Sequence, residues 1–381
     1  MSSSLESLAA LTSQLVAIDS VNPSLVPGAA GEREIAEYVA GWLRNAGLDV
    51  TLDEVAPGRF NVVGIARGSG GGRSLMLNAH MDTVGIGGMT DPLTPRRHGE
   101  RLHGRGSFDM KASLATIMLA GAHAVSAGWR GDLIITAVCD EEYASIGTAR
   151  IAETLRADGA IVTEPTGLEL CIAHKGFAWL DIETRGVAAH GSLAEEGVDA
   201  ISAMGPILCG ITALQARLDA APPHPLLRTA SVHASLISGG TELSTYPDRC
   251  TLSIERRTVP GETPEHIEAE FQELLAEESR TNPRFSASLT MGLTREPFEI
   301  APDDPFTLLV AGAIERELGA PAKITGAFGW MDSALLSAAG IPTVIFGPTG
   351  AGAHADEEWI DLPSVDSLLK VLVAAAAEFC A

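Results

Sequence analysis

Basic residues are scarce in this chain. Among its 381 residues, Lys and Arg number 26 and Asp and Glu number 49, so the formal net charge at pH 7 is −23. A field of that sign repels phosphate backbones and anionic lipid head groups. The composition therefore argues against nucleic acid and membrane surfaces as partners. A solvated surface accounts for most acidic residues, although a metal site would also use carboxylates.

Long apolar runs and targeting signals are also missing. No stretch approaches about 18 uninterrupted apolar residues, the length needed to span a bilayer. The segment MSSSLESLAALTSQLVAIDS lacks the basic start and continuous apolar core of a signal peptide. Its residues Leu8, Leu11, Leu15 and Ile18 instead have the spacing of one face of an amphipathic helix. We therefore predict a cytoplasmic protein.

Cysteines are few and show no metal-binding spacing. Their odd number, five, and the absence of a CxxC pair argue against a disulfide framework or a cysteine zinc site. Reduced thiols packed as small apolar side chains fit this pattern, and they suit a cytosolic compartment.

The order of predicted elements indicates two domains, as does a length beyond one hydrophobic core. In residues 1–175 helical and strand patterns alternate, which is typical of an α/β domain with a mainly parallel sheet. Residues 176–294 change to the order strand, helix, strand, strand, helix, strand, which is that of a ferredoxin-like module. Alternation resumes in residues 295–381. We therefore predict that the small module is inserted into the larger sheet domain.

Residues that commonly bind metals follow several predicted strands of the large domain. His80 and Asp82 follow the strand segment SLMLNA, and Asp140, Glu141 and Glu142 follow LIITAVC. Glu164 follows AIVT, His354 comes after TVIFGP, and Asp109 lies in the loop GRGSFDMK. The carboxyl ends of parallel strands form the crevice of an open α/β sheet, so these side chains should converge. Crowded carboxylates need cations, and imidazoles beside them favour zinc or a neighbouring transition metal over calcium or magnesium.

Each of these groups alone has a structural explanation. A single His at a strand end is more often hydrogen-bonded within the fold than bound to metal. An acidic triplet such as Asp140–Glu142 is commonly a solvated helix start. The glycines of GRG show only a tight turn and lack the GxGxxG spacing of a dinucleotide site. The coincidence of separate loops at one predicted sheet edge favours the functional interpretation.

The segments NAHMDTV, GRGSFDMK, CDEE, TEP and GAGAH resemble, in this order, the motifs of the zinc-dependent M20 peptidase family. The resemblance covers nearly the whole chain and implies a zinc-peptidase sheet domain with an inserted ferredoxin-like lid and dimerisation domain. It implies two zinc ions per chain, for which cobalt may substitute, bridged by Asp109. His80 and Glu164 would complete one site, and Glu142 and His354 the other.

The resemblance also implies roles for residues beside the metals. Asp82 would orient the His80 imidazole through its second nitrogen, and Glu141 would be the general base. A cis peptide bond between Asp109 and Met110 is a further implication. Two zinc ions that share a water require no nucleophilic side chain. Ser107 and the cysteines show no base beside them, which argues against an acyl-enzyme route.

Further site residues are implied in the inserted module. His190, in RGVAAHGS, would reach the active site of the partner subunit of a homodimer and help hold the oxyanion; taken alone, it reads as a surface histidine. Arg257, in SIERRTVPGE, would bind the substrate carboxylate through its paired donors. The adjacent Arg256 is the competing candidate. Many relatives carry Asn where GGTELSTYPD has Ser244. We therefore predict that the carboxylate end of the substrate is bound differently here.

These implications define the predicted function. The first hypothesis is hydrolysis of the amide bond of an N-acyl amino acid, a small-molecule substrate. A dipeptidase or carboxypeptidase acting on short peptides with the same metals is the alternative. A third hypothesis, an inactive binding or scaffolding relative, requires a lost ligand or base, and none is lost here.

Overall fold

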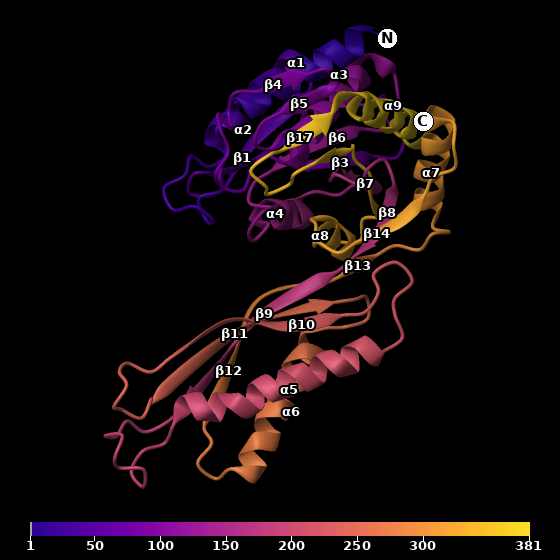
Figure 1. Ribbon diagram of the computed structural model, residues 1–381. Helices are drawn as coiled ribbons and strands as arrows, with labels where there is room; N and C mark the ends of the chain where they lie inside the picture. The colour runs from indigo at the N-terminus through magenta and orange to yellow at the C-terminus, as the bar shows by residue number, and fades with distance from the viewer. Residues whose placement is uncertain (1) are drawn as a thin grey trace. The chain divides into compact units, whose positions relative to one another are not determined.

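A mixed β-sheet runs through the larger of two units in the computed structural model, which describes residues 2–381 (Figure 1). This unit comprises the chain up to Ile172 together with Ile300–Thr325 and Met331–Ala381. The smaller unit comprises Ala173–Glu299 and Gly326–Trp330.

The smaller unit extends a few residues beyond 176–294 at each end and also includes the segment Gly326–Trp330. Its last residue, Trp330, lies with the smaller unit because its ring contacts the rings of His174 and Phe177. The Trp330 indole N–H also donates to the carbonyl oxygen of Glu296 at 3.1 Å. These contacts join residues far apart in the sequence, so no local pattern could predict them.

The central strands of the large sheet are parallel. They lie side by side in the order β6 (Leu133–Val138), β3 (Leu75–His80), β7 (Gly159–Val162) and β15 (Thr343–Ile345). All four are buried along their length, which explains why they read as continuous apolar runs. Antiparallel pairing extends the sheet through β1 (Asp49–Ala56), β2 (Arg59–Ala66) and β8 (Leu170–His174). The predicted α/β class is confirmed, with parallel strands at the sheet's centre.

Helices and short strands complete the larger unit. The helices are α1 (Ser2–Val16), α2 (Arg33–Asn45), α3 (Ala112–Ala127), α4 (Ile146–Thr154), α7 (Pro305–Leu318), α8 (Ser333–Ala338) and α9 (Leu362–Phe379), with the short turn η1 (Ser107–Lys111) before α3. Helix α3 packs on β2, β3 and β6, and α1 and α9 pack on α3. A small sheet has the order β16 (Gly350–Ala351), β17 (Trp359–Asp361), β5 (Arg101–His103), β4 (Arg96–His98). Strand β14 (Ile324–Ala327) pairs with β8, as does β13 (Phe298–Glu299), which belongs to the smaller unit.

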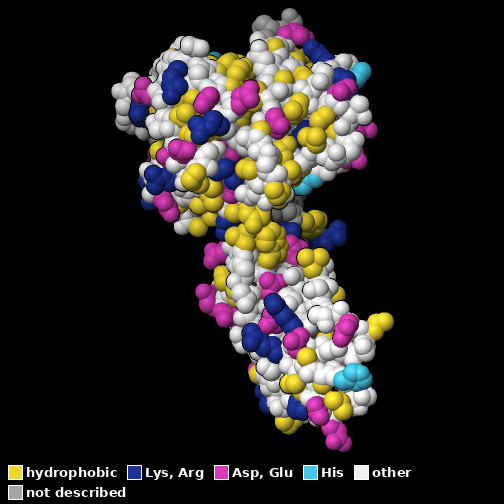
Figure 2. Space-filling view, turned by 90° about the vertical axis from the view of Figure 1, so that its left-hand side faces the viewer, with side chains coloured by type: hydrophobic (Ala, Val, Ile, Leu, Met, Phe, Trp, Pro, Cys, Tyr) yellow, Lys and Arg dark blue, Asp and Glu magenta, His cyan; other side chains and the backbone are white. Residues whose placement is uncertain are grey.

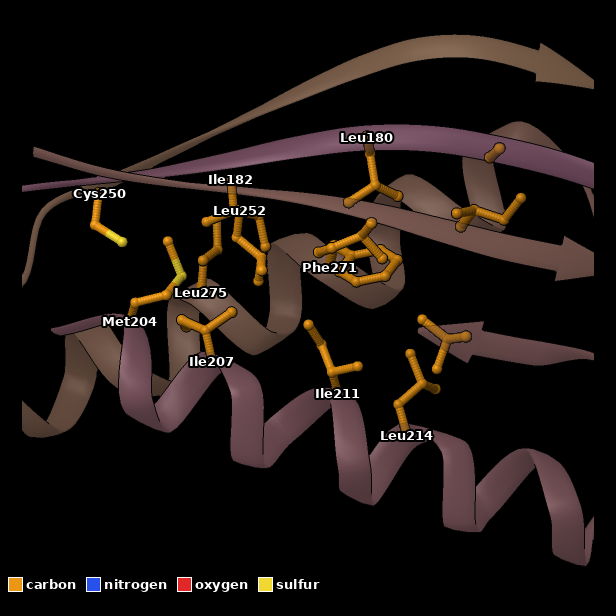
Figure 3. Close-up of a cluster of buried hydrophobic side chains, with 14 of the residues drawn as sticks. Leu180, Ile182, Met204, Ile207, Ile211, Leu214, Cys250, Leu252, Phe271 and Leu275 are labelled. Atoms are coloured by element: carbon orange, nitrogen blue, oxygen red, sulfur yellow. The ribbon is translucent and has the colours of Figure 1, made fainter. Parts of the chain in front are cut away.

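The smaller unit has the βαββαβ order expected of a ferredoxin-like module. Its elements are β9 (Gly176–Arg185), α5 (Ala200–Ala220), β10 (Ser231–Gly239), β11 (Arg249–Thr258), α6 (Pro264–Thr281) and β12 (Ala287–Arg295). The strands form an antiparallel sheet in the order β10-β11-β9-β12, with α5 and α6 on one face (Figure 1). Side chains from that face and from both helices form the core in Figure 3, including Leu180, Ile211 and Phe271.

Helix α5 is long and apolar enough to cross a membrane by length and composition. Its apolar side chains Met204, Ile207, Ile211 and Leu214 are instead buried against the sheet of the smaller unit (Figure 3). In the most apolar 18-residue window of α5, 28% is buried. On the face shown in Figure 2, basic and acidic side chains are interspersed and form no continuous basic patch.

Candidate metal centre

Side chains from neighbouring parallel strands meet at the carboxyl edge of the large sheet. His80 is the last residue of β3 and pairs there with Val138, the last residue of β6. Glu142 lies in the loop after β6, and Glu164 lies just after β7. Because β6, β3 and β7 are parallel neighbours, the loops after them open on the same edge.

One group of potential ligands combines His80, Asp109 and Glu164, whose donor atoms all lie within 4.8 Å of one another. The His80 Nε2 atom lies 3.1 Å from Asp109 Oδ1 and 3.6 Å from Glu164 Oε1. His80 and Glu164 are both buried, with 1% and 6% of their surfaces exposed. Burial therefore restrains the side chains of His80, at the end of β3, and of Glu164, shortly after β7.

A second group combines Asp109, Glu142 and His354, also within 4.8 Å of one another. The His354 Nε2 atom lies 3.4 Å from Asp109 Oδ2 and 3.0 Å from Glu142 Oε2. Asp109 thus offers Oδ1 to the first group and Oδ2 to the second, which is the arrangement a bridging carboxylate needs. The peptide bond between Asp109 and Met110 is cis, as the resemblance implied.

The electrostatics of both groups favour a bound cation. Burial raises the pKa of Glu164 well above its usual range, and burial followed by the charge of Asp109 raises the pKa of Glu142. Glu142 Oε1 is buried without a hydrogen-bond partner among the described residues. Such oxygens gain from a proton or a metal ion. The mixture of imidazole and carboxylate donors fits zinc or a neighbouring transition metal.

Asp82 is completely buried, and both its backbone carbonyl and its carboxylate face the second ring nitrogen of His80. The His80 Nδ1 atom lies 2.9 Å from the backbone carbonyl oxygen of Asp82 and 3.6 Å from the carboxylate. The carboxylate also accepts the backbone N–H groups of Glu141, at 3.1 Å, and Glu142, at 3.2 Å. Asp82 thus contacts His80 Nδ1 through its backbone and, at the longer distance, through its carboxylate, and the same carboxylate binds the loop after β6.

Glu141 stands beside the two ligand groups. Burial, followed by the charge of Glu164, raises the pKa of the Glu141 carboxyl well above its usual range. A carboxyl group with a raised pKa is a better proton acceptor than an ordinary surface glutamate. Its position in the loop is set by the bond from its N–H to Asp82 and by the Ser145 hydroxyl, which donates to the Glu141 carbonyl oxygen at 3.3 Å.

A buried polar network behind this loop was not identified from the sequence. Asn22 donates to both Asp82 and Asp140, at 2.8 and 3.1 Å. Arg59 donates to Asp140 at 2.8 Å and forms a two-pronged pair with Glu32. An arginine at the start of the otherwise mainly apolar strand RFNVVGIA was the local signal for it.

Asp332 is a further buried carboxylate that the motifs did not indicate. Its Oδ2 atom accepts the Thr148 hydroxyl at 2.6 Å, whereas Oδ1 has no hydrogen-bond partner among the described residues. Burial raises the pKa of Asp332 to about 6. Its contact with Thr148 links α8 to α4, the helix that follows the Glu141 loop.

The predicted substrate residues His190 and Ser244 lie in adjoining backbone segments of the smaller unit. The Gly191 N–H donates to the Ser244 carbonyl oxygen at 2.6 Å, and His190 pairs with Thr245. His190 Nδ1 lies 2.8 Å from the Ser192 hydroxyl. Both His190 and Ser244 are exposed, so their side chains are accessible from solvent.

Burial distinguishes the two adjacent arginines of β11. Arg256 is fully buried and forms ion pairs with Glu262 and Glu270. Arg257 points to the other face of the strand, is partly exposed, and lies 2.8 Å from Glu255 and over the Phe177 ring. Arg257 is therefore the more accessible of the two arginines.

Comparison with known protein families shows to which family this chain belongs. The profile of the family described as "Peptidase family M20/M25/M40" matches residues 76–378. The chain belongs to this family. Acetylornithine deacetylase of Myxococcus xanthus is 28% identical over 394 aligned positions, covering 100% of this chain and 99% of that protein. Acetylornithine deacetylase of Klebsiella pneumoniae is 29% identical, covering 96% of this chain and 93% of that protein.

Solved structures of M20-type enzymes share the fold. A tripeptidase from Staphylococcus aureus superposes with a TM-score of 0.79 at 21% identity, covering 99% of this chain and 98% of that one. An M20 family metallo-carboxypeptidase from Sulfolobus solfataricus gives 0.77 at 15% identity, covering 97% and 98%. Family membership and the deacetylase relatives identify this M20 protein as a metal-dependent amide hydrolase, which confirms the predicted reaction class.

Proposed function

We propose that this enzyme hydrolyses the amide bond of N-acyl amino acids with a pair of zinc ions, for which cobalt can substitute. The observation that carries the proposal is the position of Asp109. Its two carboxylate oxygens belong to different ligand groups, each completed by one histidine and one glutamate. The deacetylase names of the relatives in sequence favour an acyl amino acid as the substrate class.

Zinc ions held by these groups would lower the pKa of a water molecule and stabilise negative charge on the carbonyl oxygen. The chain's own contribution to the chemistry is proton transfer by Glu141. Its carboxylate takes a proton from the attacking water and returns it to the departing amine. Burial and the charge of Glu164 raise the pKa of Glu141, so its carboxylate binds a proton more strongly than that of an ordinary glutamate.

Residues of the smaller unit would recognise the substrate. The partly exposed guanidinium of Arg257 can donate two parallel hydrogen bonds to a carboxylate. The Ser244 hydroxyl is shorter than the Asn of many relatives, so we propose that it selects a different acyl amino acid. His190 would donate a hydrogen bond to the oxyanion from the partner subunit, since a donor aimed at the developing charge lowers the barrier.

A homodimer is part of this proposal. Strand β10 forms one edge of the antiparallel sheet, and its side chains Leu236 and Ile237 are 72% and 54% exposed. Exposed apolar edge strands pair readily with a second copy. All five cysteines are free, which supports a reducing, cytoplasmic location. The net charge of −23 argues against nucleic acid as a partner.

A dipeptidase or carboxypeptidase activity is the second candidate. The same metals and base would cleave a peptide bond next to a free carboxylate, and solved relatives in fold are described as a tripeptidase and a carboxypeptidase. The acyl side of the substrate separates the two candidates, because Arg257 would bind the carboxylate in both cases.

A hydrolysis screen tests the proposal. The metal-free enzyme would be reconstituted with zinc or cobalt and offered N-acetyl, N-succinyl and N-aromatic-acyl amino acids beside dipeptides. Faster hydrolysis of an acyl amino acid supports the deacylase, and faster hydrolysis of dipeptides supports the second candidate. No metal-dependent turnover of any substrate, or equal turnover by Glu141→Gln, contradicts both.

A further inference from the structure

Glu358 is a buried carboxylate that the proposed chemistry does not use. It is 1% exposed and lies just before β17, in the loop that carries His354. Its Oε1 atom accepts the backbone N–H groups of Phe108, at 2.9 Å, and Asp109, at 3.1 Å. Its Oε2 atom accepts the N–H of Gly106 at 2.9 Å. Three backbone N–H groups up to and including that of Asp109 thus donate to one side chain that lies far along the sequence.

Arg105 completes the arrangement. It is 2% exposed and donates to Glu358 Oε2 at 2.7 Å. Its other nitrogens donate to the carbonyl oxygens of Gly85, at 3.1 Å, and Ala355, at 3.0 Å. Gly85 lies in the loop after Asp82, and Ala355 is next to His354. One buried ion pair therefore ties together three loops, which carry Asp82, Asp109 and His354.

The two ligand groups depend unequally on this ion pair. His80 and Glu164 are buried and lie at the ends of central strands, so sheet pairing alone places them. The His354 side chain is 56% exposed, and its backbone has a φ of 62°, which non-glycine residues seldom adopt. Because packing does little to hold His354, anchors of its loop must set its position relative to Asp109.

A purely stabilising role does not explain the arrangement well. A buried ion pair often contributes little net stability, because desolvation of both charges offsets their attraction. Four hydrogen bonds to one carboxylate do, however, define a geometry. Side chains that position metal ligands in this way typically change metal affinity by about 10- to 100-fold when they are removed.

We propose that Glu358, with Arg105, is a positioning residue that assembles the Asp109–Glu142–His354 group and affects the His80–Asp109–Glu164 group less, because only the shared Asp109 of that group contacts it. This inference rests on the proposed two-metal function. Its consequence is that the two metal sites can be uncoupled by a residue that touches neither metal.

The test is cobalt titration of the metal-free protein, followed by calorimetry and by the visible spectrum of bound cobalt. Wild type should bind two ions. Glu358→Gln keeps the size of the side chain but loses its charge and one acceptor oxygen. It should retain one ion near wild-type affinity and bind the other about 10- to 100-fold more weakly. Glu357→Gln is the matched control, because this neighbouring side chain is 80% exposed and should behave as wild type.

Several outcomes separate the inference from the proposed function. If wild type binds fewer than two ions, the two-metal function fails. If wild type binds two and Glu358→Gln matches it, or loses both sites equally, the positioning role is overturned. Thermal melting without metal checks that the variant folds. If Glu358→Gln does not fold, Arg105→Lys decides: it keeps a positive charge but loses the fork to Gly85 and Ala355, and it should weaken one site selectively. Unchanged or equally weakened sites in Arg105→Lys would overturn the inference.

Discussion

The carboxylate of Asp82 accepts the backbone N–H of Glu141 at 3.1 Å. Asp82, two residues after the proposed ligand His80, is thereby bonded to the proposed base Glu141. The same carboxylate accepts the N–H of Glu142 and the amide of Asn22. A defect at Asp82 should therefore disturb metal binding and proton transfer together.

Asp82→Ala should lower zinc affinity and turnover by about 10- to 100-fold each, because it frees the loop that carries Glu141 and Glu142. Asp82→Asn should fall between this variant and wild type, since an amide oxygen can still accept one N–H. Zinc titration and steady-state kinetics measure the two effects. Normal zinc affinity in Asp82→Ala would show that the carboxylate does not organise the loop.

Glu141→Gln should bind two zinc ions and lose turnover by about 100-fold or more, because the amide cannot accept the proton of water. Metal content and kcat are the measurements. Glu153→Gln, on the exposed side of α4, is the matched control and should keep wild-type activity. Near-normal turnover by Glu141→Gln would reject its role as base.

The stability of the metal-free protein should fall as pH rises. Hydrogen bonds to Asp109 and Glu142 raise the pKa of His354 from 6.5 to about 10. Its stabilising contribution is complete below pH 6.5 and is lost as pH rises through about 10. Burial raises the pKa of Glu164, which acts with the same sign, because ionising a buried carboxyl disfavours the folded state.

Melting temperatures in a chelator between pH 6.5 and 10 test this prediction. His354→Ala should show a shallower decline, whereas His266→Ala, an exposed histidine on α6, should keep the wild-type slope. A melting temperature that stays level or rises with pH would contradict the assignment. Zinc affinity should change in the opposite direction, rising with pH as the ligands lose their protons.

Arg59→Met should destabilise the fold by about 3 to 5 kcal/mol, because it leaves the carboxylates of Glu32 and Asp140 buried without their partner. Arg67→Met is the matched control: its side chain is 58% exposed, so the loss of its ion pairs should cost about 1 kcal/mol or less. Denaturant unfolding of the metal-free protein compares the two. Similar midpoints would refute the importance of the buried network.

Mixing Glu141→Gln with His190→Ala tests whether sites are shared across a homodimer. If His190 acts in the partner's site, one site of each mixed dimer has an intact Glu141 and an intact partner histidine, and activity partly returns. Subunit exchange is followed by differently tagged chains. Continued inactivity despite demonstrated exchange would place both residues in one chain's site.

The sequence by itself determined the fold class and the edge of the sheet where ligands gather. Buried parallel strands read as continuous apolar runs, and polar residues lie at or just after the end of each run, as with His80 at the end of β3 and Glu164 shortly after β7. Such signals are local, because strand and ligand are neighbours in the chain. The ordered motifs added the pairing of ligands and the cis bond at Asp109, through resemblance to the family.

Only the tertiary structure decided which groups hold those ligands in place. Glu358 meets the N–H of Asp109 across 249 residues of sequence, and Arg59 meets Asp140 across 81. Neither pair leaves a periodic or spacing signal, because its partners come together only when the sheet has formed. Arg256 and Arg257 show the same limit: alternation along a strand places them on opposite faces, but burial against Glu262 and Glu270 decides which one remains available to a ligand.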